Sequence, residues 1–152
     1  MTKEEKKILS QIKKNNPNLD VEYTATLAKT IVQTSKKYGI HPKVLAAMLM
    51  QESAYKISAK NIKCGISIEN GKKDCIIVDF GIGQINHKTI KAFKFDRNKL
   101  LTDLSYSIEA SAKVLADFKR MYGHKESDYW SRYNASTPSK RLVYKRLVAR
   151  YM

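Results

Sequence analysis

The chain has 152 residues, 43% of them hydrophobic, and its 29 Lys and Arg against 14 Asp and Glu give a formal net charge of +15. This length fits one domain with a substantial core, and no apolar run approaches the roughly 18 residues that span a membrane. The positive charge favours polyanionic partners such as nucleic acid, anionic lipid or an acidic cell wall. Because the basic residues are spread along the chain without a nucleic-acid-binding motif, we expect no specific nucleic-acid ligand.

The N-terminal segment predicts a short helix over residues 3–14, ended by an Asn-Asn-Pro-Asn sequence. Its few apolar positions would dock it on the surface of the domain. We therefore expect a single domain over residues 1–152, with residues 1–19 as a peripheral helix. The first residues are charged and lack the apolar core of a signal peptide, so the chain shows no signal peptide.

Two helices are predicted next. Asp20 can cap a helix that runs to about Lys37 and ends at Gly39. His41-Pro42 then opens another helix, with proline at its first position. This second helix is apolar and ends in Gln51-Glu52-Ser53.

Glu52 is the most informative residue of the chain. It follows Leu45, Met48 and Leu49 at helical spacing, so its carboxyl should project from the face that packs inward. A carboxylate on an apolar face is costly unless it is paired, hydrogen-bonded or neutral. Glu52 is therefore a candidate for a raised pKa and for acid/base chemistry. The alternative is a glutamate at a frayed helix end that reaches water.

Residues 64–80 predict a small two-stranded ribbon, because isoleucine and valine flank the turn signal Asn70-Gly71. Cys64 and Cys75 lie on either side of this turn. A disulfide between them would remove roughly 3 kcal/mol of loop entropy from the unfolded chain. Two unrelated thiols are the alternative, which a cytosolic protein would favour. The three histidines are scattered, so we expect no metal site.

The rest of the chain predicts helices at about 87–94, 103–121, 126–135 and 139–151. Together these elements indicate a mainly α fold with one small β-hairpin inserted after the Glu52 helix. No internal repeat or interdomain linker is present.

Three segments then occur in order: Gln51-Glu52-Ser53, the stretch from Asp79 to Asn86, and Tyr133-Asn134-Ala135. Together they resemble the soluble lytic transglycosylase catalytic domain of the lysozyme superfamily. The nearest resemblance is to small single-domain enzymes that accompany secretion systems, conjugation systems and phage particles. It covers roughly residues 22–151 and implies an α+β lysozyme-like fold.

The chain departs from this family at a few positions. Gly83 stands where the family often has Met, and Ser136 follows Ala135 where a glycine is common. Near the start of the long helix, Tyr106-Ser107 replaces an Asn that is often found there. These differences concern contacts with the substrate more than the class of reaction.

The resemblance also implies roles for individual residues. Glu52 would be the single catalytic acid and base, and five residues would bind or position the substrate: Ser53, Ile82, Gln84, Tyr133 and Asn134. From the residues alone, Tyr133 could equally be a core aromatic, and Ser53 a plain serine at a helix end. Asp79 is interpreted as a structural turn residue that supports the loop from Gly81 to Gln84, and Trp130 as a core residue. The two glycines of that loop would let backbone approach a glycan.

The function expected from the resemblance is cleavage of the β-1,4 bond between N-acetylmuramic acid and N-acetylglucosamine in peptidoglycan, with formation of 1,6-anhydro ends and without a cofactor. The place of action would be the bacterial envelope, or a virion if a phage encodes the chain. A secretion, conjugation or phage machine would be a possible partner, and the chain would be a monomer. The alternatives are a hydrolytic muramidase similar to goose-type lysozymes, a non-catalytic wall-binding protein, and a basic nucleic-acid-binding protein.

Overall fold

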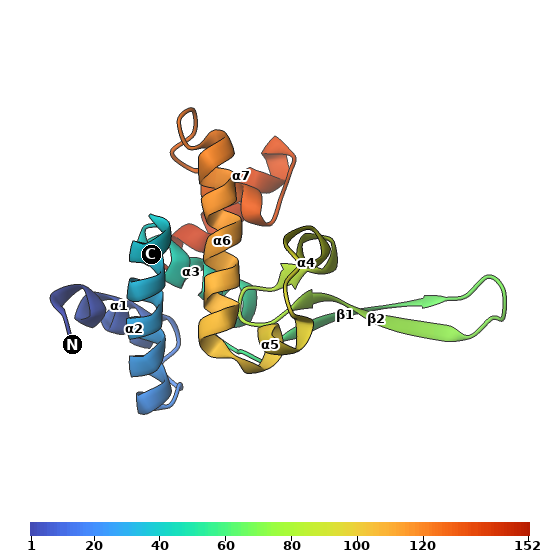
Figure 1. Cartoon of the computed structure of the whole chain (residues 1–152), viewed down its shortest axis with the longest axis horizontal. Coiled ribbons are helices and arrows are strands. Elements are labelled where there is room, and N and C mark those ends of the chain that lie inside the picture. Colours follow the sequence, from blue (N-terminus) through green and yellow to red (C-terminus); the bar gives the residue numbers. More distant parts are fainter.

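The computed structural model describes all 152 residues as a helical body from which a long two-stranded hairpin extends (Figure 1). The elements in chain order are α1 (Lys3–Asn15), α2 (Val21–Tyr38), α3 (Pro42–Ser53), β1 (Lys60–Ile66), β2 (Lys73–Phe80), β3 (Ile85–Asn86), α4 (His87–Phe93), α5 (Arg97–Thr102), α6 (Leu104–Tyr122), the 3-10 helix η1 (Tyr129–Tyr133) and α7 (Pro138–Ala149). None of the helices combines the length and the apolar composition needed to cross a membrane. The mainly α fold with one inserted hairpin is confirmed.

The predicted helix boundaries have the expected physical causes. The Asp20 carboxylate accepts a hydrogen bond from the Tyr23 amide at 3.0 Å and so begins α2. Gly39 ends this helix in the left-handed conformation, with φ of 65°. Pro42 occupies the first turn of α3, where its missing N–H costs no hydrogen bond.

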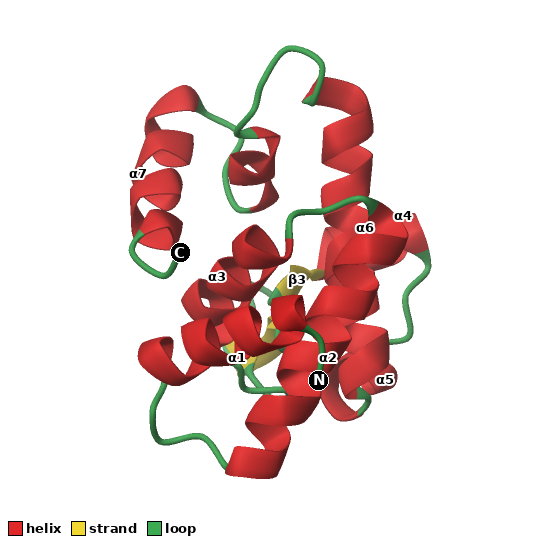
Figure 2. Cartoon of the chain, turned by 90° about the vertical axis from the view of Figure 1, so that its left-hand side faces the viewer, coloured by secondary structure: helices red, strands yellow, loops and turns green.

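The helix α3 lies at the centre of the body. It contacts α1 and α2 on one side and α7 on another (Figure 2). Leu45, Met48 and Leu49 are almost fully buried in a core to which every one of these neighbouring helices contributes. The N-terminal helix takes part as well, because Ile12 of α1 is fully buried in the same core. Glu52 therefore lies near the end of a helix that packs against others on more than one side.

The sheet has three antiparallel strands in the order β1-β2-β3. Cys64 faces Cys75 across the hairpin, and the two form a disulfide, which confirms the predicted bridge. The strand β1 starts at Lys60, somewhat before the predicted ribbon, and a register shift lies between Asn61 and Ile62. Only Asp79 and Phe80 at the base of β2 pair with β3.

Three elements differ from the sequence prediction. The short helix α5 was not expected; the Asp96 cap and the fully buried Leu100 hold its six residues in place. The strand β3 has two residues and exists only through pairing with β2. The helix predicted at 126–135 is instead the five-residue 3-10 helix η1, which has no side-chain cap at its start and buries Trp130 and Ser131.

Candidate active site

Glu52 lies in the last turn of α3, and its carboxyl has partners from distant parts of the chain. The Asn134 side chain, just after η1, donates a hydrogen bond from Nδ2 to Glu52 Oε1 at 3.0 Å. The Tyr144 hydroxyl of α7 is also a neighbour that lowers the pKa of Glu52, although it makes no hydrogen bond of ordinary length and angle. Three elements that are far apart in sequence therefore meet at this carboxyl.

Burial is the main cause that raises the pKa of Glu52, to about 7. The hydrogen bond from Asn134 acts in the opposite direction and stabilises the carboxylate, while the negative charge of Asp79 raises the pKa further. A carboxyl with a pKa of about 7 is protonated in a large fraction of molecules at neutral pH. Glu52 is thus able both to donate and to accept a proton under these conditions.

A cleft of about 310 Å³ opens beside this carboxyl. Asn134 lines the cleft and at the same time binds Glu52, so it connects the two. The other lining residues come from β2, β3, α4, α6, η1 and the loop before β3: Asp79, Gln84, Ile85, Asn86, Thr89, Val114 and Tyr133. A larger open depression of about 730 Å³ lies between α1 and the start of α3, but it contains none of the residues around Glu52. The smaller cleft is therefore the candidate substrate site.

Ser53 ties the end of α3 to the loop that follows β2. Its hydroxyl donates to the carbonyl oxygen of Ile82 at 2.7 Å and accepts from the Lys56 amide at 3.2 Å. The Ile82 side chain is fully buried in the core. Ser53 and Ile82 are therefore next to Glu52, but they hold the loop in place rather than facing the cleft.

Gln84 ends this loop with a positive φ of 47°, which is uncommon for a residue other than glycine. Its side-chain amide donates to the carbonyl oxygens of Ala59 at 3.0 Å and Gly81 at 2.9 Å. Gln84 also lines the cleft. Since both amide protons are engaged by backbone, the side-chain oxygen is the group that Gln84 has free for a ligand.

At Gly83 the loop before β3 packs tightly against α6 and η1. A Cβ at this position would overlap the Ser111 hydroxyl and come within 2.7 Å of the Tyr133 hydroxyl. The Tyr133 hydroxyl donates to the Gly83 carbonyl at 2.6 Å. The space that a side chain would occupy is filled by the protein itself, so this glycine serves packing between the loop, α6 and η1.

Asp79, interpreted from the sequence as a structural turn residue, lies next to the cleft. It lines the cleft, and its charge raises the pKa of Glu52. Each carboxylate oxygen accepts an amide hydrogen bond, at 2.7 Å from Asn61 on β1 and at 3.2 Å from Asn86 on β3. The sheet thereby holds a second, fixed carboxylate at the edge of the site.

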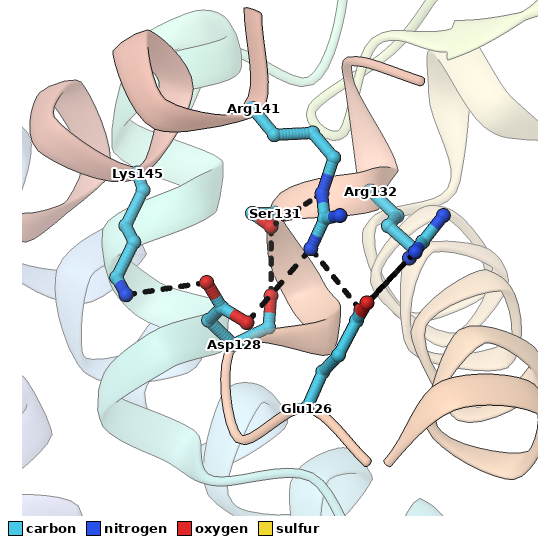
Figure 3. Close-up of polar contacts among 6 residues, drawn as sticks. All are labelled: Glu126, Asp128, Ser131, Arg132, Arg141 and Lys145. Carbon is cyan, nitrogen blue, oxygen red and sulfur yellow. Dashed lines mark hydrogen bonds and ion pairs between the residues drawn. The ribbon is translucent and has the colours of Figure 1, made fainter. Parts of the chain in front are cut away.

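An ion-pair network joins η1 to α7 and so fixes the two elements that supply Asn134 and Tyr144 (Figure 3). The Glu126 carboxylate accepts two hydrogen bonds from Arg132, at 2.9 and 2.8 Å, and one from Arg141 at 3.1 Å. The hydrogen bonds from Arg132 are the first cause that lowers the pKa of Glu126 to about 2, so this carboxyl stays ionised. Glu126 is the one carboxylate that bonds to both arginines.

Gln84, Tyr133 and Asn134 line one cleft, and Asn134 is bonded to Glu52. Ser53 and Ile82 lie behind the cleft. Trp130 belongs to the core, as predicted. Sequence reasoning missed Tyr144. Its only signal was the spacing of Tyr144 and Val148, the two buried residues of α7, on one face of the predicted C-terminal helix.

The chain is similar to known proteins over most of its length. The Shigella flexneri protein named IpgF is 30% identical over 112 residues, which cover 72% of this chain and 66% of that relative, just under two thirds of its length. The sequence of residues 29–146 matches the transglycosylase SLT domain, and this span includes Glu52, the loop before β3, η1 and Tyr144. The chain therefore belongs to the transglycosylase SLT domain family.

Proposed function

We propose that the chain is a lytic transglycosylase that cleaves the β-1,4 bond between N-acetylmuramic acid and N-acetylglucosamine in peptidoglycan. Membership in the SLT family supports this class of activity. The observation that carries the proposal is a partly buried Glu52, with its pKa raised to about 7, beside a cleft lined by polar groups. Leaving-group protonation is the task that such a carboxyl performs in glycan cleavage.

The proposed reaction uses Glu52 twice. The protonated carboxyl first donates its proton to the glycosidic oxygen as that bond breaks and positive charge develops on the anomeric carbon of the muramic acid. The resulting carboxylate then accepts the proton of the C6 hydroxyl of the same sugar, whose oxygen forms the new bond to the anomeric carbon. A 1,6-anhydro ring closes, no water is consumed, and Glu52 is protonated again.

The polar groups around the cleft suit a sugar ligand. Gln84 and Asn134 line the cleft, and in the proposed complex the Gln84 side-chain oxygen and the Asn134 side chain would bind hydroxyl or N-acetyl groups. The net charge of +15 would hold the protein near the carboxylates of the peptidoglycan stem peptides. We place the activity in the bacterial envelope, where this substrate occurs and where a disulfide persists.

Hydrolysis is the second candidate, and Asp79 is the observation that favours it. A muramidase needs a group that positions or activates water opposite the leaving sugar. Asp79 is a fixed carboxylate in the cleft and interacts with Glu52 by charge. Its amide partners are also consistent with a purely structural role in the sheet.

Mass spectrometry of the fragments released from purified peptidoglycan tests both candidates. Wild type should release muropeptides that end in 1,6-anhydro-N-acetylmuramic acid, and Glu52→Gln should release none while keeping the wild-type circular dichroism spectrum. Asp79→Asn should leave the anhydro ends unchanged. Reducing ends, heavier by one water and lost in Asp79→Asn, would reject the transglycosylase in favour of the hydrolase. Equal release by wild type and Glu52→Gln would reject Glu52 as the acid.

A further inference from the structure

The hairpin of β1 and β2, which we call the arm (residues 60–78), has no part in the proposed reaction. It runs out from the helical body and ends in a turn that no other element covers (Figure 1). Residues 60–66 and 68–76 are all exposed, and the buried residues of β2, Val78 and Phe80, lie at its base, where the strand pairs with β3. The outer part of the arm is therefore free to bind something else.

The arm is unusually apolar for a segment so exposed. Four of its isoleucines keep more than half of their surface open to solvent: Ile62 at 54%, Ile66 at 75%, Ile68 at 102% and Ile76 at 58%. Large apolar side chains that gather on an exposed surface commonly mark an interaction site.

These side chains lie on both faces of the arm. Side chains two positions apart along a strand share a face, so Ile62 and Ile66 lie on the same face as Cys64 and the disulfide. Ile76 pairs with Lys63 and lies on the other face. Ile68 lies in the turn at the tip. A partner would have to surround the outer arm to cover all four isoleucines.

The tip is preformed rather than loose. The Ser67 amide donates to the Lys72 carbonyl at 2.9 Å, and the Gly71 amide donates to the Ser67 carbonyl at 2.9 Å. The disulfide joins the two strands farther down the arm. Binding through this tip would therefore require little ordering of the chain.

The charges of the arm indicate the charge of the partner. Four lysines lie along it (Lys60, Lys63, Lys72 and Lys73), against the two carboxylates Glu69 and Asp74. Lys72 and Lys73 follow the tip turn, Glu69 is the neighbour of Ile68 within it, and the arm as a whole has two more positive than negative charges. The partner should offer apolar volume and negative charge together.

Three other occupants fit less well. A second copy of the chain would also carry +15, and the like charges oppose association. Sugar rings commonly stack on aromatic side chains, and residues 60–78 include no Phe, Trp or Tyr. A flat protein surface would cover one face of the arm, whereas a bilayer surrounds on all sides the part of the arm that enters it.

We propose that the arm binds the surface of an anionic lipid bilayer, with Ile66 and Ile68 inserted among the headgroups and upper acyl chains. The lysines behind the tip would place their ammonium groups at the level of the lipid phosphates, while their aliphatic stems pass along the apolar layer. This is a surface association, in the manner of other amphipathic segments that lie in the interface. It leaves the Glu52 cleft on the body free, and it does not depend on the proposed catalytic activity.

Vesicle flotation with the purified, disulfide-intact protein tests the proposal. One set of vesicles is phosphatidylcholine alone and the other contains phosphatidylglycerol as well. Wild type should float with the anionic vesicles only. The double variant Ile66→Asp/Ile68→Asp should partition at least about tenfold less, because each isoleucine contributes apolar burial that aspartate cannot.

The matched control is Val21→Asp/Leu142→Asp, which changes the charge equally at two exposed apolar residues of the body. This control should bind anionic vesicles nearly as wild type does. Both variants should keep the wild-type melting temperature. Equal loss of binding in the two variants would show that net charge alone holds the protein on the vesicles and would overturn the proposal. So would a wild type that does not float.

Discussion

The Glu52 site and the arm differ in the contacts that hold them. At the site, α3, η1 and α7 converge, and the bond between Asn134 and Glu52 joins residues 82 positions apart. The arm is formed by two successive strands, a turn and one disulfide between residues 11 positions apart, with almost no buried surface. The site therefore depends on the packing of the whole body, whereas the arm depends on local pairing and a covalent link. Changes in the body should propagate to the site, and changes in the arm should stay there.

Glu52→Gln should have the largest effect, and it tests how the packed body changes the properties of the Glu52 carboxyl. Because the pKa of Glu52 is raised from 4.5 to about 7 in the folded protein, the folded state binds this proton more tightly than the unfolded chain does. That contribution to stability is complete below pH 4.5 and is lost as the pH rises through about 7. The loss amounts to at most about 3 kcal/mol.

The measurement is the free energy of unfolding in urea from pH 4 to 8, for wild type and for Glu52→Gln. The variant carries no ionisable group here, so its stability should fall less with rising pH than that of wild type. Glu22→Gln removes an exposed carboxylate of α2 and controls for the loss of one charge. Parallel curves for wild type and Glu52→Gln would contradict the raised pKa.

Substitution of glycine by alanine should destabilise the protein in the body and have almost no effect in the arm. At Gly83 a Cβ meets the hydroxyls of Ser111 and Tyr133, so Gly83→Ala should destabilise the protein by about 2 kcal/mol and strongly reduce glycan cleavage. At Gly65, in the arm, no atom lies within 4 Å of the added Cβ. Gly65→Ala should change stability by less than about 0.5 kcal/mol. Urea unfolding measures the stability of the two variants. Similar changes in the free energy of unfolding for both would refute the packing role of Gly83.

Asn134→Ala removes the hydrogen bond that holds the pKa of Glu52 down. We expect the pKa of Glu52 to rise further and the activity to fall by roughly tenfold, as the loss of one hydrogen bond to a charged group predicts. Carbon-13 NMR titration of Glu52 measures the pKa without relying on activity. Asn18→Ala, at an exposed position before α2, is the control. A pKa that stays at the wild-type value would show that Asn134 does not stabilise the carboxylate.

Glu126→Gln tests whether η1 and α7 need their shared carboxylate. Loss of its charge weakens both arginine contacts, so we expect a lower melting temperature and a severalfold lower turnover, because Asn134 and Tyr144 are positioned less well. Asp117→Asn breaks a comparable bond to Arg120 on the surface of α6 and should leave turnover unchanged. Equal turnover in the two variants would show that the ion pairs of Glu126 do not contribute to the position of the site residues.

The smallest effect on catalysis is expected from Cys64→Ser/Cys75→Ser. The disulfide removes roughly 3 kcal/mol of entropy from the open arm, so its loss should speed amide hydrogen exchange between residues 60 and 78. Glycan cleavage and the melting temperature of the body should stay close to wild type. A clear drop in either would show that the arm and the body are coupled more tightly than their few contacts indicate.

Local rules explain why much of the fold was predictable. The cap at Asp20, the left-handed Gly39 and the proline that opens α3 act within one or two helical turns. The turn at Asn70-Gly71 brings Cys64 opposite Cys75, and both features lie within a short stretch of chain. The short elements α5 and β3 escaped prediction because burial and strand pairing, rather than local pattern, hold them in place.

The sequence by itself determined the helical plan, the disulfide-linked hairpin and a carboxyl on the inward face of α3, because each depends on residues a few positions apart. Only the tertiary structure decided what that carboxyl meets. The contact with Asn134, the nearness of Tyr144 and Asp79 and the engagement of Ser53 with Ile82 all join separate elements. The pKa of Glu52 follows from these contacts, since burial and neighbouring charges exist only after the body has packed.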